Sequence, residues 1–265
     1  MARDATDRAR RVMEEARRLL DACGIERPPV DLVRIARHLG IRRIRELDVR
    51  LDGQLVELED GGYEVILSRN APHTRRRFTL AHEIGHILAA SPDDESMSCG
   101  DAATEDLCNR VAAELLIPAR FIADAPVAEM DVETFRRLAT RFQCSLEATA
   151  WRVLNMGQVT GALLIWRPQE GGKLELSASP RTFGFEAPFE NGAVLDGGVP
   201  FVRQLMAQNE GPVTYGGAPD GRVYTGDYIR LNKVLLMYLR CRGQPPSSKT
   251  RRRTAGAPGQ GELFS

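Results

Sequence analysis

The chain has 265 residues, of which 43% are hydrophobic and 27% charged, with 36 basic and 36 acidic side chains. This composition is typical of a globular protein with a core, and the formal net charge of zero favours neither nucleic acid nor an anionic membrane surface as a partner. The apolar runs are too short to span a membrane, and five cysteines without a C-x-x-C pair predict reduced thiols in a cytoplasmic protein.

The first part of the chain is predicted to hold two helices followed by short strands. Residues 6–23 form a charged amphipathic helix pattern without the apolar core of a secretion signal. A second helical pattern covers residues 29–40, which begin with proline and end with glycine. Strand-like segments follow over residues 41–68, separated by Asp-Gly and Gly-Gly turn signals, and predict a small antiparallel meander.

Residues 78–90, FTLAHEIGHILAA, carry an H-E-x-x-H motif on a predicted helix. His82 and His86 are four residues apart, so both rings lie on one helix face and can hold one metal ion. Glu83 lies about 100° farther around the helix, where it could accept a proton from water without ligating the metal. The motif alone is only moderately specific, because two histidines one turn apart can also pack against a core.

The next predicted helix, over residues 104–117, adds a candidate third ligand. When its residues are projected at about 100° each, Glu105 and Asn109 fall on the apolar stripe that is expected to face the core. Glu114 falls on the opposite side, which is the expected solvent face. A buried carboxylate without a partner is unfavourable, and a divalent cation held by two imidazoles would neutralise it.

These positions predict a metal centre with two histidines and one glutamate. With His82, His86 and Glu105 as ligands, one coordination position stays open, which is typical of catalytic rather than structural zinc. Asn109, one helical turn after Glu105, could hold a ligand imidazole through its other ring nitrogen. Zinc (Zn²⁺) suits this set, and manganese or iron could also occupy it.

Two alternatives to a catalytic metal centre stay open for these residues. The histidines and Glu105 could be polar core groups that satisfy one another. Alternatively, Cys99 and Cys108 are close in the sequence and could contribute thiolates to a more structural metal site. Cys108 is also one turn from Glu105, where we expect a buried, inert thiol rather than a redox switch.

The rest of the chain has three predicted parts. Two helical patterns within residues 124–159 are joined at residues 143–145 and predict a helix-turn-helix-like segment. Its second helix offers Arg152 as its single cation, so direct DNA binding is not expected. Residues 160–242 alternate strand patterns with one helix and predict a small α+β module. Residues 243–265 are rich in proline, glycine, serine and arginine and are expected to form a disordered tail.

The motifs together resemble the ImmA/IrrE-type zinc metallopeptidases, a family that includes radiation-response regulators of deinococci and anti-repressors of mobile elements. The resemblance is carried by PVDLVRIARHLGI, RRRFTLAHEIGHIL and EDLCNRVAAELLIP and covers about residues 28–120. It implies an α+β fold in which residues 1–123 form a zincin-like metallopeptidase domain with helices and a small mixed or antiparallel sheet. It suggests a GAF-like fold for the module at residues 160–242. It also implies a gluzincin-like site, with His82, His86 and Glu105 as zinc ligands and Glu83 as the catalytic acid/base.

The resemblance further implies a zinc-dependent, site-specific endopeptidase whose substrate is a helix-turn-helix transcriptional repressor. Cleavage at one place would release stress-response or mobile-element genes from repression. The alternative is a regulatory binding protein that keeps a peptidase-like scaffold but sequesters its partner without cleaving it.

Two further segments could contact partners. The strand pattern GYEVILS, which contains Tyr63, Val65 and Leu67, is a candidate sheet edge that could pair with an extended substrate segment. Plain sheet structure accounts for this pattern equally well. The terminal QGELF resembles a bacterial sliding-clamp-binding peptide of the form Q-x-x-L-F, although matches of this length are common by chance.

Overall fold

The structure is a computed structural model that describes residues 2–90, 101–122, 130–218, 221–231 and 233–241. These residues form two compact units: those within 1–124 and 139–148 belong to the first, and those within 125–138 and 149–254 to the second. Cys99, the predicted disordered tail and its QGELF segment lie outside the described residues. No helix among those described is long and apolar enough to cross a membrane.

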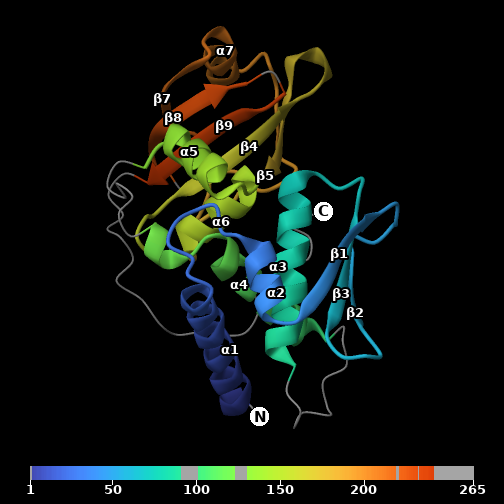
Figure 1. The fold of residues 1–265 in the computed structure, drawn as a ribbon. Coiled ribbons are helices and arrows are strands. Elements are labelled where there is room, and N and C mark those ends of the chain that lie inside the picture. Colours follow the sequence, from blue (N-terminus) through green and yellow to red (C-terminus); the bar gives the residue numbers. More distant parts are fainter. Residues whose placement is uncertain (1, 91–100, 123–129, 219–220, 232, 242–265) are drawn as a thin grey trace. The chain divides into compact units, whose positions relative to one another are not determined.

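The first unit contains the predicted helices and a three-stranded sheet (Figure 1). Its elements are α1 (Ala2–Ala22), α2 (Leu32–His38), β1 (Ile41–Leu47), β2 (Gly53–Glu57), β3 (Tyr63–Ser68), α3 (His73–Ala89), α4 (Ala102–Leu116) and a short 3-10 helix (Ala119–Phe121). Apolar residues recur along α1 at helical spacing, and α1 packs against α3 and α4. The carboxylates of Asp31 and Asp101 cap the first turns of α2 and α4 by accepting hydrogen bonds from backbone N–H groups.

Strand β3 lies in the middle of this sheet, whose order is β1-β3-β2. It is parallel to β1 and antiparallel to β2, so the predicted antiparallel meander is wrong for its first strand. The candidate sheet edge at Tyr63, Val65 and Leu67 is also wrong, because β3 is paired on both sides. The physical reason is burial: Val65 and Leu67 are buried, whereas β1 carries exposed arginines, and charged side chains are typical of edge strands.

Glu114 of α4 is buried, although its position on the helix predicted exposure to solvent. Its carboxylate pairs with the guanidinium of Arg17 on α1, at an N–O distance of 3.6 Å. Helix α1 therefore covers the side of α4 that the sequence pattern assigned to solvent, and α3 covers another side. The charged partner explains how an acidic side chain is tolerated there, since a buried charge is unfavourable unless it is paired.

The second unit is built around a six-stranded antiparallel sheet with the order β6-β5-β4-β9-β8-β7. Its elements are β4 (Ala162–Pro168), a 3-10 helix (Glu170–Gly172), β5 (Leu174–Ala178), β6 (Val194–Leu195), α7 (Pro200–Ala207), β7 (Glu210–Tyr215), β8 (Tyr224–Arg230) and β9 (Leu235–Cys241). Its core includes aromatic side chains, with the Trp166 and Phe189 rings edge-on and their centroids 5.1 Å apart. The strands and the single longer helix agree with the predicted α+β character of this part of the chain.

Helices α5 (Val132–Phe142) and α6 (Leu146–Asn155) form the helix pair that the sequence predicted before this sheet. The division between the two compact units passes through the pair, since residues 139–148 belong to the first unit. Within the second unit, the carboxylate of Asp227 on β8 accepts a hydrogen bond from the backbone N–H of Val132 at 2.9 Å. This bond ties the start of α5 to the sheet.

Candidate metal centre

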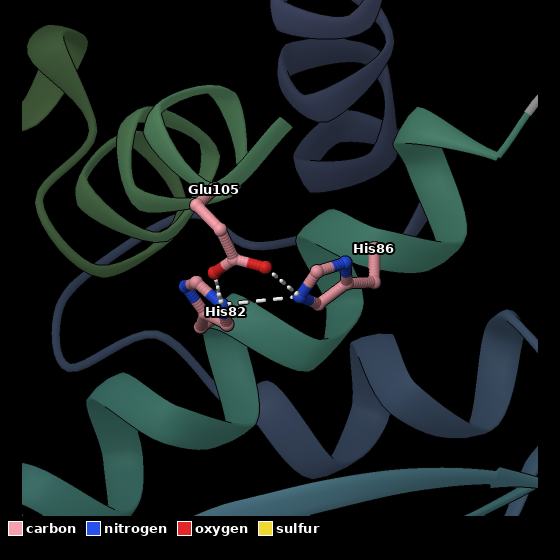
Figure 2. A group of neighbouring side chains, drawn as sticks. All are labelled: His82, His86 and Glu105. Carbon is pink, nitrogen blue, oxygen red and sulfur yellow. Dashed lines mark hydrogen bonds and ion pairs between the residues drawn. The ribbon is translucent and has the colours of Figure 1, made fainter. Parts of the chain in front are cut away.

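The structure brings the three predicted metal ligands together (Figure 2). His82 and His86 lie one turn apart on α3, and Glu105 comes from the first turn of α4. One ligand atom from each residue lies within 4.8 Å of the other two. Oε2 of Glu105 is 3.1 Å from Nε2 of His82, and Oε1 of Glu105 is 3.5 Å from Nε2 of His86. A single ion could therefore contact all three side chains.

The close crossing of α3 and α4 makes this convergence possible. Gly85 of α3 packs directly on Cys108 of α4, and a Cβ atom at Gly85 would lie only 2.9 Å from Cα of Cys108. His82 and His86 lie on either side of Gly85 along α3, and Glu105 precedes Cys108 by about one turn of α4. The crossing of the two helices at Gly85 and Cys108 therefore directs the histidines and Glu105 toward each other. Cys108 is fully buried and lies outside the ligand group, which agrees with the expected inert thiol.

Glu105 is more exposed than the apolar stripe on its helix predicted. Solvent reaches 39% of its side-chain surface, whereas the two histidines are mostly buried. The reason is its place in the first turn of α4, where the helix has just begun. This partial exposure suits a catalytic metal, which must admit water and substrate, better than a structural metal, whose coordination is closed.

Asn109 holds the ring of His82 in one orientation. Its side-chain oxygen Oδ1 lies 2.9 Å from Nδ1 of His82, and Asn109 is buried. Because an amide oxygen can only accept, Nδ1 of His82 donates this hydrogen bond and carries a proton. The other ring nitrogen, Nε2, then faces Glu105 and His86. This is the role predicted for Asn109 from its position on α4.

Two ring nitrogens and a carboxylate converge in this centre. Nε2 of His82 is 3.1 Å from Nε2 of His86 and 3.1 Å from Oε2 of Glu105. The neutral ring of His86 has one N–H donor, which can satisfy only one of these neighbours. Burial, and to a smaller extent the neighbouring His82, lowers the pKa of His86, whereas the negative charge of Glu105 raises it. A divalent cation would satisfy all three groups at once. Two imidazoles and a carboxylate are also a ligand set that zinc accepts, so these residues fit a metal.

Replacing Asn109 with alanine is expected to weaken metal binding about 10- to 100-fold without unfolding the protein. The ring of His82 would lose the acceptor that determines its tautomer and orientation. Competition with a chromophoric chelator measures the affinity, and Asn70→Ala is a matched control because Asn70 is an exposed asparagine that bonds Asp48 away from the centre. Equal metal affinities of Asn109→Ala and the unaltered protein would contradict this role.

Glu83 is buried on the same helix but is not a member of the ligand group. Burial raises the pKa of Glu83 to about 7, and the negative charge of Glu105 acts in the same direction. A hydrogen bond from the backbone N–H of Leu55 acts in the opposite direction, because it stabilises the charged form. A carboxyl group that titrates near neutral pH can accept and return a proton, as general acid–base catalysis requires. The acid/base role of Glu83 stays a prediction that this environment supports.

Strand β2 forms the edge of the sheet next to the candidate centre. The carbonyl of Asp52 and the N–H of Leu58, which flank the strand, bond to its hairpin partner. Bonded and unbonded positions alternate in an antiparallel pair, so three residues of β2 direct their backbone groups away from β3. Among the described residues, no strand pairs with that side of β2. The three residues are Gly53, Leu55 and Glu57.

The sequence pattern does not reveal this contribution of β2. The Asp-Gly pair at the start of the strand is a turn signal, but Gly53 is also the residue at which the strand approaches α3. No local signal marks the N–H of Leu55 as a donor to Glu83, because every residue except proline carries the same backbone group. Both features depend on contacts between elements that are distant in the sequence.

Comparisons with known proteins match the part of the chain that contains this centre. Residues 36–154 match the family model of the IrrE N-terminal-like domain. The chain is 33% identical over 111 residues to the radiation response metalloprotease IrrE of Deinococcus deserti, covering 35% of this chain and 40% of that protein. It is 40% identical over 74 residues to the radiation response metalloprotease IrrE of Deinococcus radiodurans, covering 24% of this chain and 23% of that protein. The chain therefore matches less than half of the length of these curated relatives.

A solved structure, a Mycobacterium tuberculosis transcriptional regulator, is similar in fold. The similarity has a TM-score of 0.50 and covers 86% of this chain and 74% of that chain, at 17% sequence identity. At this identity, the likeness concerns the fold alone.

Proposed function

We propose that this chain, whose residues 36–154 match the model of the IrrE N-terminal-like domain, is a metal-dependent, site-specific endopeptidase of the ImmA/IrrE type. The observation that carries the proposal is the convergence of His82, His86 and Glu105 on α3 and α4, next to the buried carboxyl group of Glu83. The two curated relatives are named metalloproteases, which supports proteolysis as the reaction.

The proposed substrate is a helix-turn-helix transcriptional repressor in the cytoplasm, cleaved at one place. Its cleavage would release stress-response or mobile-element genes. The names of the curated relatives, radiation response metalloproteases, support a role in the response to stress. The resemblance of the sequence motifs to anti-repressors of mobile elements supports a repressor as the target.

The proposed metal is zinc, with manganese and iron as the other candidates. His82, His86 and Glu105 would hold it in a gluzincin-like set, that is, an H-E-x-x-H motif with a downstream glutamate. A divalent ion bound there would supply Lewis-acid activation of water and polarisation of the scissile carbonyl. Asn109 would keep Nε2 of His82 free of a proton and turned toward the ion.

Glu83 would carry the proton transfers. Its carboxylate would accept a proton from the attacking water and later donate it to the nitrogen of the leaving amine. A pKa near 7 for Glu83 supports both steps, because the group must be ionised before the attack and protonated after it. The proposal gives Glu83 no ligand role, in agreement with its absence from the ligand group.

The free side of β2 is the proposed binding site for an extended substrate segment, in place of the edge predicted at β3. A peptide can add to an exposed sheet edge through main-chain hydrogen bonds. The backbone groups of Gly53 and Glu57 and the carbonyl of Leu55 face that side, while the N–H of Leu55 is used by Glu83. A peptide paired with β2 would therefore run beside the proposed base.

The parts after the peptidase domain are proposed to select the substrate and to respond to a signal. We assign residues 124–159 as a helix-turn-helix-like docking segment and residues 160–242 as a small GAF-like module, which the six-stranded antiparallel sheet supports. Direct DNA binding by α6 is not proposed, because Arg152 is its single cation. Selection of one repressor needs a recognition surface in addition to the cleavage site, and these parts provide one.

The direct test is to incubate the metal-loaded protein with the helix-turn-helix repressors encoded near its gene and to measure intact masses. We expect one repressor to yield two fragments whose masses add up to the repressor plus one water. A chelator should prevent this, and restored metal should recover it. Failure to cleave any of these repressors in the metal-loaded state, or cleavage that the chelator leaves unchanged, would contradict the proposal.

A further inference from the structure

Strand β2 meets helix α3 at two points, and both lie at Glu83. The first is a packing contact: a Cβ atom on Gly53 would overlap the methyl group of Thr79 and would lie 3.4 Å from Oε1 of Glu83. Thr79 and Glu83 are four residues apart on α3, so they share one helix face. The missing side chain at Gly53 therefore lets the backbone of β2 lie directly against the carboxyl group of Glu83.

The second point is the backbone N–H of Leu55. It faces away from β3, on the side of β2 where Gly53 meets Glu83, and as a hydrogen-bond donor to the Glu83 carboxylate it lowers the pKa of that group. This N–H has no role in the ladder between β2 and β3, so the bond to Glu83 satisfies it. A hydrogen bond to a charged acceptor is also among the stronger ones in proteins. The bond therefore holds the carboxylate at a defined place beside the strand.

Thr79 is held in place as well. Its hydroxyl group donates to the backbone carbonyl of Arg75, one turn earlier on α3, at 3.1 Å. With the hydroxyl group fixed, the methyl group of Thr79 lies toward Gly53. The distance between β2 and α3 is therefore set by the contact between the backbone of Gly53 and the oriented methyl group of Thr79. That spacing determines whether the N–H of Leu55 reaches Glu83.

We infer that β2 positions the proposed catalytic base: Leu55 holds the Glu83 carboxylate through its backbone N–H, and Gly53 and Thr79 set the spacing that this bond requires. The inference rests on the proposed peptidase function, because the position of Glu83 affects a rate only if Glu83 transfers protons. Displacement of a catalytic group by about 1 Å can reduce a rate about a hundredfold. Since β2 is also the proposed site for the substrate strand, one element would align both the base and the peptide.

Amide hydrogen exchange tests the bond without any substrate. In the metal-loaded protein, the N–H of Leu55 should exchange about tenfold more slowly, or slower still, than those of Gly53 and Glu57 on the same side of β2. Glu83→Ala should remove this protection, whereas Glu83→Gln should keep much of it, because the glutamine side chain still offers an oxygen acceptor. An exchange rate of Leu55 that is unchanged in Glu83→Ala would overturn the inference.

A compensating pair of substitutions tests the spacing. Gly53→Ala should lose the protection of Leu55 and should lower kcat on a cleaved repressor about ten- to a hundredfold. Adding Thr79→Ser removes the overlapping methyl group and keeps the hydroxyl group that bonds Arg75, so the double variant should recover most of both losses. Gln54→Ala, an exposed position on the other face of β2, is the matched control and should resemble the unaltered protein.

The results separate this inference from the proposed function. One outcome is that the N–H of Leu55 is protected only when Glu83 is present, but no repressor is cleaved. This outcome would confirm the hydrogen bond and would reject both the peptidase function and the positioning role. Cleavage by a protein in which Gly53→Ala changes neither the exchange of Leu55 nor kcat would keep the peptidase and reject the positioning role. If the double variant is as impaired as Gly53→Ala, the methyl group of Thr79 does not set the spacing, and the backbone oxygen of Ile66, 3.2 Å from the same Cβ position, limits the strand instead. Retention of metal by each variant, measured by elemental analysis, shows that the ligand group is intact.

Discussion

Replacing Glu83 with glutamine is expected to reduce repressor cleavage about a hundred- to ten-thousandfold while the protein keeps its metal. Glutamine has nearly the same shape as glutamate and can still accept the bond from the N–H of Leu55, but it cannot take a proton from water. The ligand group of His82, His86 and Glu105 does not include residue 83, so metal binding should persist. Single-turnover cleavage and metal content, measured on the same preparation, give both quantities.

The same variant has an expected effect on stability that distinguishes a lost base from a damaged fold. In the folded, metal-free protein, burial raises the pKa of Glu83 from 4.5 to about 7, so the folded state favours the protonated form. The contribution of Glu83 to the free energy of unfolding is therefore greatest below pH 4.5, and it is lost as the pH rises toward 7. Glutamine does not ionise, so the metal-free variant should become the more stable protein over this range, by up to about 3 kcal/mol above pH 7. Denaturant unfolding at several pH values measures the difference.

Glu83→Gln also separates the peptidase from a protein that only sequesters its partner. If cleavage produces the biological effect, cells carrying this variant should keep the target genes repressed. If the variant still releases those genes while it cannot cleave, the peptidase function fails as the cause of de-repression, and the binding alternative replaces it. A variant that has lost its metal does not answer this question, so metal content must be measured first.

Replacing Glu105 with alanine is expected to weaken metal binding by more than about a hundredfold, which exceeds the effect of losing a partner such as Asn109. The carboxylate reaches both histidines and is the only charged member of the ligand group. Its side chain is 39% exposed, so its removal should leave the core of the first unit intact. The metal-free variant should therefore fold, and its circular dichroism spectrum should match that of the unaltered protein.

Metal that binds only the folded protein also raises its thermal stability. Metal at a concentration about a hundred times its dissociation constant stabilises the folded state by about 2.7 kcal/mol, so Tm of the unaltered protein should rise on adding metal. The Tm of Glu105→Ala should not respond at the same concentration. Asp106→Ala is the matched control, because Asp106 is the adjacent acidic residue on α4, is partly exposed and lies outside the ligand group. A metal response of Glu105→Ala equal to that of the control would rule out Glu105 as a ligand.

Local spacing determined much of the candidate site from the sequence alone. Residues four apart on a helix share a face, so His82 and His86 had to lie together wherever α3 packs, and the same holds for Glu105 and Asn109 on α4. The helix pair α5–α6 and the alternating strands of the later module could also be predicted. Their patterns of apolar residues and turn signals extend over only a few neighbouring residues.

Tertiary structure decided which elements face each other. The crossing at Gly85 and Cys108 brings the two helices together, and no periodicity within either helix specifies it. The burial of Glu114 against α1 has the same origin, because a helical pattern shows which face is apolar but not which neighbours cover the others.

The order β1-β3-β2 could not be predicted either, because strand pairing joins residues that are separated along the chain. Turn signals predict that neighbouring strands pair, yet the buried residues of β3 favour a central position, and this preference determined the order. As a result, β2 became the edge beside Glu83, with the N–H of Leu55 as its donor. The sequence alone thus determined the chemical groups and their local spacing, whereas non-local packing decided which of them meet, since backbone donors and close helix contacts leave no residue-specific pattern.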